Sequence, residues 1–209
     1  KMTRTDTINM FSLPPLMVFE YGGDMDKILE YVSNIEYRDS TGNIKSANDY
    51  IFDDDELKEL KEFCLKSVSE YIDDVLGVDI DIEMQQSWIN LNQPGQHHPD
   101  HYHGNSFISG VFYILSDEKE GAPICFKSEL HKSNFSILTV PKNIFLKYYP
   151  CTAASYFHPS TPGQLVLFSS TTTHCVPTNT TKTPRVSLSF NTYPKIPFGS
   201  REHLTYMRG

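Results

Sequence analysis

The sequence has few cysteines, no long apolar segment and no signal-peptide pattern. Its cysteines show no Cys-x-x-Cys pair, so neither a disulfide framework nor a thiolate zinc site is predicted. We expect buried free thiols at Cys64, Cys125, Cys151 and Cys175. No run approaches the roughly 20 apolar residues of a membrane span, and no apolar core follows the first residues. The expected location is therefore the cytoplasm, without membrane contact.

The sequence also lacks an excess of positive charge. It has 18 Lys and Arg residues against 26 Asp and Glu residues, a formal net charge of −8. A phosphate backbone repels such a surface on average, which argues against nucleic acid as a partner. Hydrophobic residues make up 39% of the 209 residues, with 12 Tyr and 13 Phe, so a folded core is expected and disorder is not.

Two amphipathic helices are predicted in the first part of the chain. Asp24 can cap a helix over residues 25–35, whose apolar residues fall at helical spacing. The acidic cluster at 53–56 suits the positive N-terminal end of a second helix that continues to Gly77. The stretch 39–49 between them is polar and is predicted to be a loop.

From about residue 80 the pattern changes to short β-branched and aromatic runs between turn residues, which is typical of antiparallel strands. A proline-interrupted edge strand is also expected at 11–19. The predicted strands are Ile82–Asn92, Ser106–Leu115, Pro123–Phe126, Ser136–Val140, Asn143–Tyr149, Gly163–Ser169 and Arg185–Thr192. This mainly β pattern predicts a jelly roll or small barrel, with the two helices packed on its outer face.

We expect the chain to form one domain, 1–209. Its parts are an N-terminal edge strand and helices at 8–78, the jelly-roll core at 79–192 and an extended tail at 193–209.

Four histidines lie within seven residues, at 97, 98, 101 and 103. Neutral imidazole is a common metal ligand, and side chains at i and i+2 of an extended segment point to the same side. Either His101 with His103 or His98 with Asp100 can therefore reach one ion. The competing interpretation is a solvated polar loop without a metal.

A second candidate group lies some 70 residues later. His174 follows a predicted strand, and Arg185 begins an alternating strand eleven residues beyond it. A buried guanidinium requires an anionic partner, and a bound dicarboxylate can supply two parallel hydrogen bonds. The plainer alternatives are a core histidine and an arginine paired with a carboxylate of the protein.

These motifs together resemble those of the iron(II)- and 2-oxoglutarate-dependent oxygenases. The similarity runs from about Phe11 to Asn191 and is greatest to a branch found in marine bacteria and phages and related to prolyl 4-hydroxylases. The motifs that carry it are Ser87-Trp88-Ile89-Asn90, His101-x-His103, Ser109-Gly110-Val111-Phe112-Tyr113, Phe168-Ser169-Ser170, His174-x-Val176 and Arg185-Val186-Ser187-Leu188-Ser189-Phe190-Asn191.

The resemblance implies a double-stranded β-helix with iron(II) at its open mouth. His101 and His174 would be iron ligands from two strands, and Arg185 would hold the far carboxylate of 2-oxoglutarate. The residues implied for the cosubstrate pocket are Arg185, Ser187, Tyr113, Asn90 and Asn191.

One position departs from the family's usual site of two histidines and one carboxylate. In the register of the closer branch, His103 occupies the carboxylate position. Either His101, His103 and His174 form a three-histidine site, or the chain slips and His98 and Asp100 supply a His-x-Asp pair with His174, which makes Asp100 the rival third ligand. We favour His103, because Pro99 disfavours a regular strand at His98 to Asp100.

The activity implied by the resemblance is dioxygenase chemistry that releases succinate and carbon dioxide. The expected substrate is peptidyl and prolyl-like, or a small amino acid-like molecule, and the expected location is the cytoplasm of a bacterium or of a phage-infected host. Two other functions fit the residues. One is a cupin-like three-histidine metalloenzyme that needs no 2-oxoglutarate, and the other is a non-catalytic jelly-roll binding or structural module.

Overall fold

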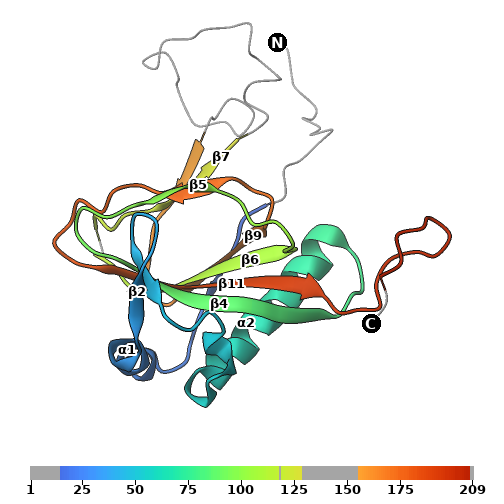
Figure 1. Ribbon diagram of the computed structural model, residues 1–209, viewed down its shortest axis with the longest axis horizontal. Coiled ribbons are helices and arrows are strands. Elements are labelled where there is room, and N and C mark those ends of the chain that lie inside the picture. The colour runs from blue at the N-terminus through green and yellow to red at the C-terminus, as the bar shows by residue number, and fades with distance from the viewer. Residues whose placement is uncertain (1–14, 118, 129–154, 208–209) are drawn as a thin grey trace, which may run out of the picture.

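The strands of the second half of the chain build two antiparallel sheets. The computed structural model describes residues 15–117, 119–128 and 155–207. In the described part of the chain, the large sheet has the strand order β1-β9-β6-β11-β4-β3-β2, and the small sheet has the order β5-β10-β7-β8. Figure 1 shows the small sheet above the large one, with the helices on the opposite face of the large sheet. This is the jelly-roll arrangement that the sequence predicts.

The strands are β1 Met17–Glu20, β2 Tyr37–Asp39, β3 Ile44–Ser46, β4 Ile82–Asn92, β5 His98–His101, β6 Ile108–Leu115, β7 Ile124–Lys127, β8 Ser155–His158, β9 Gln164–Ser169, β10 His174–Val176 and β11 Arg185–Pro194. The helices are α1 Met25–Asn34, the 3-10 turns η1 Ile51–Asp53 and η2 Asp55–Leu57, α2 Lys58–Tyr71 and the short π-helix η3 Ile72–Leu76.

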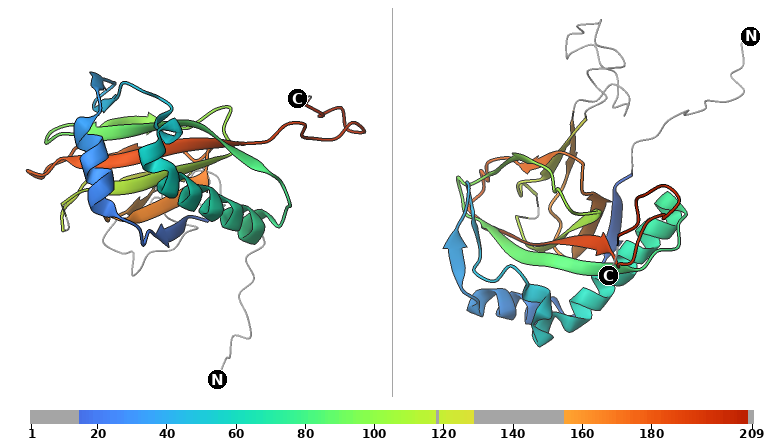
Figure 2. Two further views of the ribbon diagram at one scale, coloured as in Figure 1. Left: turned by 90° about the horizontal axis from the view of Figure 1, so that it is seen from below. Right: turned by 45° about the vertical axis from the view of Figure 1, so that its right-hand side comes forward.

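Both predicted helices form. The carboxylate of Asp24 accepts the backbone N–H groups of Asp26 and Lys27 at 3.0 and 3.1 Å and so caps α1. The second helical segment ends at Gly77, which adopts the left-handed conformation (φ 61°) that favours glycine. Figure 2 shows α1 and α2 lying across the strands of the large sheet, on its outer face.

The two faces of the large sheet bury two different cores. Outward-facing side chains such as Phe112 and Leu188 pack against Leu60 and other helix residues. The second core lies between the sheets, and its buried residues are Val111, Tyr113, Ile124, Phe126, Val166 and Phe168. Because residues alternate along a strand, β6 contributes to both cores. The second core forms the apolar base of the cavity described below.

The loop predicted at 39–49 is wrong. Residues 37–46 form the β2–β3 hairpin, and β3 pairs with β4 through Ile44 opposite Leu91 and Lys45 opposite Asn90. The hydroxyl of Ser46 also accepts the backbone N–H of Ile89 at 3.0 Å. Strands of three residues are too short to show period-two alternation, and here β3 is stabilised by pairing with β4, and β2 by pairing with β3.

The expectation that Pro99 disfavours a strand at His98 to Asp100 is also wrong. β5 contains Pro99 and is the outer strand of the small sheet, where a missing N–H group breaks no ladder. Strands β8 and β10 were not expected either. The strands predicted at Ser136–Val140 and Asn143–Tyr149 lie outside the described residues.

The structure bears on the expectations for the cysteines and for membrane-spanning helices. Cys64 and Cys125 are buried free thiols, Cys175 is a partly exposed one, and Cys151 lies outside the described residues. Within the described ranges, no helix is both long enough and apolar enough to cross a membrane.

The contact between Gly110 and Phe190 gives a test of packing beneath the site. The two residues are opposite each other on β6 and β11, and a Cβ atom on Gly110 would overlap the ring of Phe190. Phe190 is itself buried against Phe52. We expect Gly110→Ala to lower the free energy of unfolding by about 1–3 kcal/mol. Chemical denaturation measures this change, with Gly22→Ala as the control because Gly22 faces open space. A Gly110→Ala protein as stable as the control would contradict this packing.

Candidate active site

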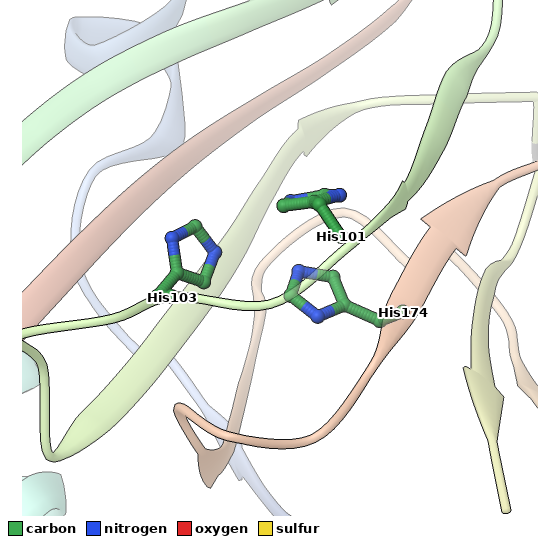
Figure 3. A group of neighbouring side chains, drawn as sticks. All are labelled: His101, His103 and His174. Carbon is green, nitrogen blue, oxygen red and sulfur yellow. The ribbon is translucent and has the colours of Figure 1, made fainter.

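Three histidines from two strands and a turn converge at one end of the space between the sheets. His101 ends β5, His103 follows it in the next turn, and His174 begins β10 directly opposite His101. The ring centroids lie 4.2 Å apart for His101 and His174, 5.1 Å for His101 and His103, and 5.2 Å for His103 and His174. One nitrogen from each ring lies within 4.8 Å of the other two, as Figure 3 illustrates. Such a group of three imidazoles can hold one divalent ion.

Hydrogen bonds to the backbone orient two of the rings. Nδ1 of His101 is 2.9 Å from the carbonyl oxygen of Pro99, and Nδ1 of His174 is 2.9 Å from that of Thr172. A carbonyl only accepts, so each Nδ1 carries the proton and each Nε2 presents its lone pair. This is the usual arrangement of metal-binding histidines, which donate their second N–H to a carbonyl or carboxylate.

The third ring is fixed differently. The amide of Asn191 contacts Nδ1 of His103 at 3.4 Å, and the hydroxyl of Ser109 donates to Oδ1 of Asn191 at 2.8 Å. The backbone N–H of His103 also donates to the carbonyl of Ser170 at 2.9 Å. The turn after β5 is thereby attached to β6, β11 and the turn after β9.

Burial favours the neutral form of two of these imidazoles, His103 and His174. It lowers the pKa of His174 to about 3 and that of His103 to about 4, with the neighbouring His101 adding to both shifts. His98, which lies beside His101, has a pKa lowered to about 4, first by burial and then by the charges of His101 and Arg185. Neutral rings with free lone pairs are the form that a metal ion requires.

Asp100 lies apart from this group. Its side chain is exposed and is not among the residues whose ligand atoms converge. Its carboxylate is instead close to Cys175, whose pKa rises to about 12 through burial and, next, the hydrogen bond to Asp100. Cys175 follows His174 on β10 and points to the opposite face of the strand. The geometry therefore favours His103 over Asp100 as the third candidate ligand.

A buried arginine lies further inside the same space. Arg185 begins β11 and is 2% exposed. Its Nε donates to the carbonyl of Ala122 at 3.1 Å, and Nη1 donates to the hydroxyl of Ser187 at 3.0 Å. Among the described residues, no carboxylate forms an ion pair with it. A guanidinium buried without a counter-ion is costly, so this arginine calls for an anionic ligand.

Tyr113 and Asn92 surround the guanidinium with further unpaired groups. Cζ of Arg185 lies 5.2 Å from the ring centroid of Tyr113, and Asn92 is opposite Arg185 in the β4–β11 register. Within the described structure, the buried hydroxyl of Tyr113 and both amide atoms of Asn92 have no hydrogen-bond partner. Burial raises the pKa of Tyr113 to about 12, so the phenol keeps its proton and can donate it. The donors around Arg185 fit a carboxylate.

One cavity of about 190 Å³ joins the histidines to the arginine. Asn90 and Ser187 line it, as predicted for the cosubstrate pocket. Asn191 contacts His103 instead and is not among the lining residues. Among the lining residues, Asn43, Lys45 and Asn92 had no predicted role, Trp88 entered only as part of a motif, and His98 only as an alternative metal ligand. The alternation of Trp88, Asn90 and Asn92 along one face of β4 was a usable signal for a polar wall.

The sequence of the core decides the family. Residues 86–191, about half of the chain, match the profile of the family described as "Putative 2OG-Fe(II) oxygenase". The chain belongs to this family. The protein is therefore a 2-oxoglutarate-dependent oxygenase, an oxidoreductase whose cofactors are iron(II) and 2-oxoglutarate. The narrower assignment to a branch of marine bacteria and phages stays a prediction. No curated protein matches the sequence.

Solved structures share the fold of this oxygenase at low sequence identity. A 2OG-Fe(II) oxygenase family oxidoreductase from Burkholderia pseudomallei is 10% identical, with a TM-score of 0.60 over 85% of this chain and 83% of that one. A Pseudomonas putida prolyl-4-hydroxylase is 13% identical (TM-score 0.55; 84% and 91%). HygX from Streptomyces hygroscopicus, solved with nickel, 2-oxoglutarate and hygromycin B, is 9% identical (TM-score 0.57; 87% and 83%).

The donor set of this oxygenase fits both cofactors. Three imidazoles whose ligand atoms lie within 4.8 Å of one another suit a divalent metal, and the unpaired guanidinium of Arg185 suits a diacid in the same cavity. The predicted residues His101, His103, His174, Arg185 and Ser187 thus lie around one space, although up to 86 positions separate them in the chain.

Proposed function

We propose that His101, His103 and His174 bind iron(II), and that Arg185 binds the far carboxylate of 2-oxoglutarate. The observation that carries this proposal is the buried, unpaired guanidinium of Arg185, which opens into the same cavity as the three imidazoles. A cupin-like enzyme that needs no cosubstrate gives no reason for such a cation. A non-catalytic module explains neither the imidazole cluster nor the cation.

The proposed reaction hydroxylates a C–H bond. When bound, iron(II) with 2-oxoglutarate supplies the means to activate dioxygen. The overall change is that substrate R–H, dioxygen and 2-oxoglutarate give R–OH, succinate and carbon dioxide, with one oxygen atom entering R–OH and the other entering succinate. The keto acid is oxidised together with the substrate. The reaction therefore requires no further reductant.

The protein's part in this reaction is to orient groups and to exclude water. The carbonyls of Pro99 and Thr172 keep the lone pairs of His101 and His174 directed into the cavity. The apolar residues Val111, Ile124 and Phe168 line the cavity and keep bulk water from its base.

The substrate class that we propose is peptidyl and prolyl-like, or small and amino acid-like. Supporting it are two structures of similar fold: a prolyl-4-hydroxylase from Pseudomonas putida, and HygX, which was solved with the small molecule hygromycin B bound. We also propose that residues 1–209 work as one oxygenase domain, with 79–192 as its catalytic core.

Anaerobic titration tests the proposed function. Adding 2-oxoglutarate to the iron(II)-loaded protein should produce a visible charge-transfer absorption band, and exposure to air should release succinate. A correctly metallated protein that gives neither band nor succinate would favour the cupin-like alternative. A protein that binds no iron(II) at all would favour the non-catalytic module.

Tyr113→Phe should separate cosubstrate binding from stability. The hydroxyl has no hydrogen bond to lose within the described structure, so the ligand-free variant should unfold at the same denaturant concentration as the wild type or a higher one. Its dissociation constant for 2-oxoglutarate should rise about tenfold, because a hydrogen bond to a carboxylate is lost. Denaturation curves and the anaerobic titration measure the two effects. Unchanged affinity would show that the hydroxyl does not contact the cosubstrate.

A further inference from the structure

The cavity has a polar end that neither the histidines nor Arg185 requires. Asn43 and Lys45 lie on the β2–β3 hairpin at one edge of the large sheet, beside β4 (Figure 1), and both line the cavity. They belong to the hairpin that the sequence pattern did not reveal. Residues i and i+2 of a strand share a face, so Asn43, Lys45 and their neighbour Asn90 all face the same space.

Asn43 presents an unpaired acceptor there. Its side chain is 3% exposed, and Nδ2 donates to Oδ1 of Asn90 at 3.2 Å. Nδ2 of Asn90 in turn donates to the hydroxyl of Ser189 at 2.9 Å. These bonds hold the Asn43 amide in place, yet its Oδ1 has no partner within the described residues. A buried carbonyl without a partner is unfavourable, so this oxygen is suited to an N–H donor from a ligand.

Lys45 brings positive charge to the same end. Arg38 and Lys45 are directly opposite each other on β2 and β3, an arrangement that is repulsive for like charges. Both pair with the single carboxylate of Asp49, and Nζ of Lys45 lies 3.1 Å from Oδ1. The two cations share this one carboxylate, so the ammonium of Lys45 has no carboxylate of its own among its ion pairs in the described structure. The side chain of Lys45 is 29% exposed, so an anionic ligand can reach it.

This polar end adjoins the histidine cluster. Trp88 precedes Asn90 by two residues on β4 and faces the cavity with it. The ring centroid of Trp88 lies 6.0 Å from that of His103. A molecule held by Asn43 and Lys45 would therefore extend along Trp88 towards the candidate metal ligands.

We infer that Asn43 and Lys45 form the substrate subsite, and that the substrate is a free α-amino acid or a close zwitterionic relative. Its carboxylate pairs with Lys45, and an N–H of its amino group donates to Oδ1 of Asn43. A cavity of about 190 Å³ that also receives 2-oxoglutarate suits a small substrate. This inference rests on the proposed function. It narrows the proposed substrates, which were peptides or small amino acid-like molecules, to the small molecules.

The test uses the twenty standard L-amino acids and their α-carboxamides as probes. At least one free amino acid should stimulate succinate release above the substrate-free rate, and its carboxamide should show a KM at least about tenfold higher, because the charged hydrogen bond is lost. Lys45→Gln should raise the KM of the acid by about the same factor and leave that of the carboxamide nearly unchanged. Calorimetric titration of the active amino acid into protein holding zinc(II) and 2-oxoglutarate should show the same differences without turnover.

Lys27→Gln is the matched control, because it removes one exposed lysine charge from α1 on the outer face of the large sheet. It should behave as the wild type. The inference is overturned if no free amino acid binds or stimulates, if only peptides do, or if acid and carboxamide are equivalent in the wild type. That last comparison needs no variant. The 2-oxoglutarate absorption band reports on the proposed function separately, so a protein that shows the band but ignores all free amino acids would overturn the inference alone.

Discussion

Replacement of His174 by alanine is expected to lower the affinity for iron(II) by more than about 100-fold, because changing even a hydrogen-bond partner of a metal ligand costs about 10- to 100-fold. His174 is 4% exposed and contributes the one candidate nitrogen that comes from β10. Without it, His101 and His103 present two ligands, which is too few for a tightly held ion. Metal content after gel filtration and succinate release in air measure the loss.

Two comparisons make this result specific. His203→Ala removes an exposed histidine of the C-terminal segment and should leave the metal content at the wild-type level. Asp100→Asn tests the rival ligand and should also retain metal, whereas His103→Ala should lose it. If His174→Ala still binds a full equivalent of metal, the three-histidine site is refuted. If Asp100→Asn loses the metal and His103→Ala keeps it, Asp100 rather than His103 is the third ligand.

Arg185→Gln is expected to raise the dissociation constant for 2-oxoglutarate by about 30-fold or more. Breaking a buried charge pair typically costs about 2–5 kcal/mol, because the remaining carboxylate is left without its partner. Glutamine can still accept or donate a hydrogen bond near Ser187 but carries no charge. The anaerobic absorption band, titrated with 2-oxoglutarate, measures the effect.

The ligand-free protein gives a second measurement on the same variant. Burial lowers the pKa of Arg185, because the charged guanidinium is poorly solvated there. In the ligand-free protein this charge is therefore unfavourable. We therefore expect 2-oxoglutarate to raise the melting temperature of the zinc(II)-loaded wild type and to have little effect on that of Arg185→Gln. Arg201→Gln, a change in the exposed C-terminal segment, should retain the wild-type response. An Arg185→Gln protein that binds the cosubstrate normally would mean that Arg185 serves packing alone.

The strands and helices predicted from the sequence are those whose apolar and polar residues follow a regular pattern over many positions. β4 is eleven residues long and ends in apolar Ile89 and Leu91 alternating with Asn90 and Asn92, and α1 combines a capping aspartate with an apolar stripe. The β2–β3 hairpin was missed because each strand has three residues, and because β3 is stabilised by pairing with β4 and β2 by pairing with β3 rather than by a pattern of their own. Asn43 and Lys45 were missed with it.

The site was only partly readable from residue spacing. The spacing of His101 and His103 indicates that both can reach one ion, but nothing local to His174 shows that it lies opposite His101, 73 positions away. The resemblance to a family implied that the two histidines meet at one ion, but the pairing of β10 with β5 that brings them together is not encoded in the local pattern. The missing carboxylate partner of Arg185 likewise became visible only once the surrounding side chains were in place.

The position of β5 at the border of the small sheet has a consequence for association with other chains. An outer strand exposes backbone groups that can template the addition of a foreign strand. Pro99 has no N–H to offer, and the exposed charge of Asp100 would have to be desolvated on contact. The rim that carries His101 is thereby protected against self-assembly, and a guest peptide could not extend the sheet with a complete ladder there.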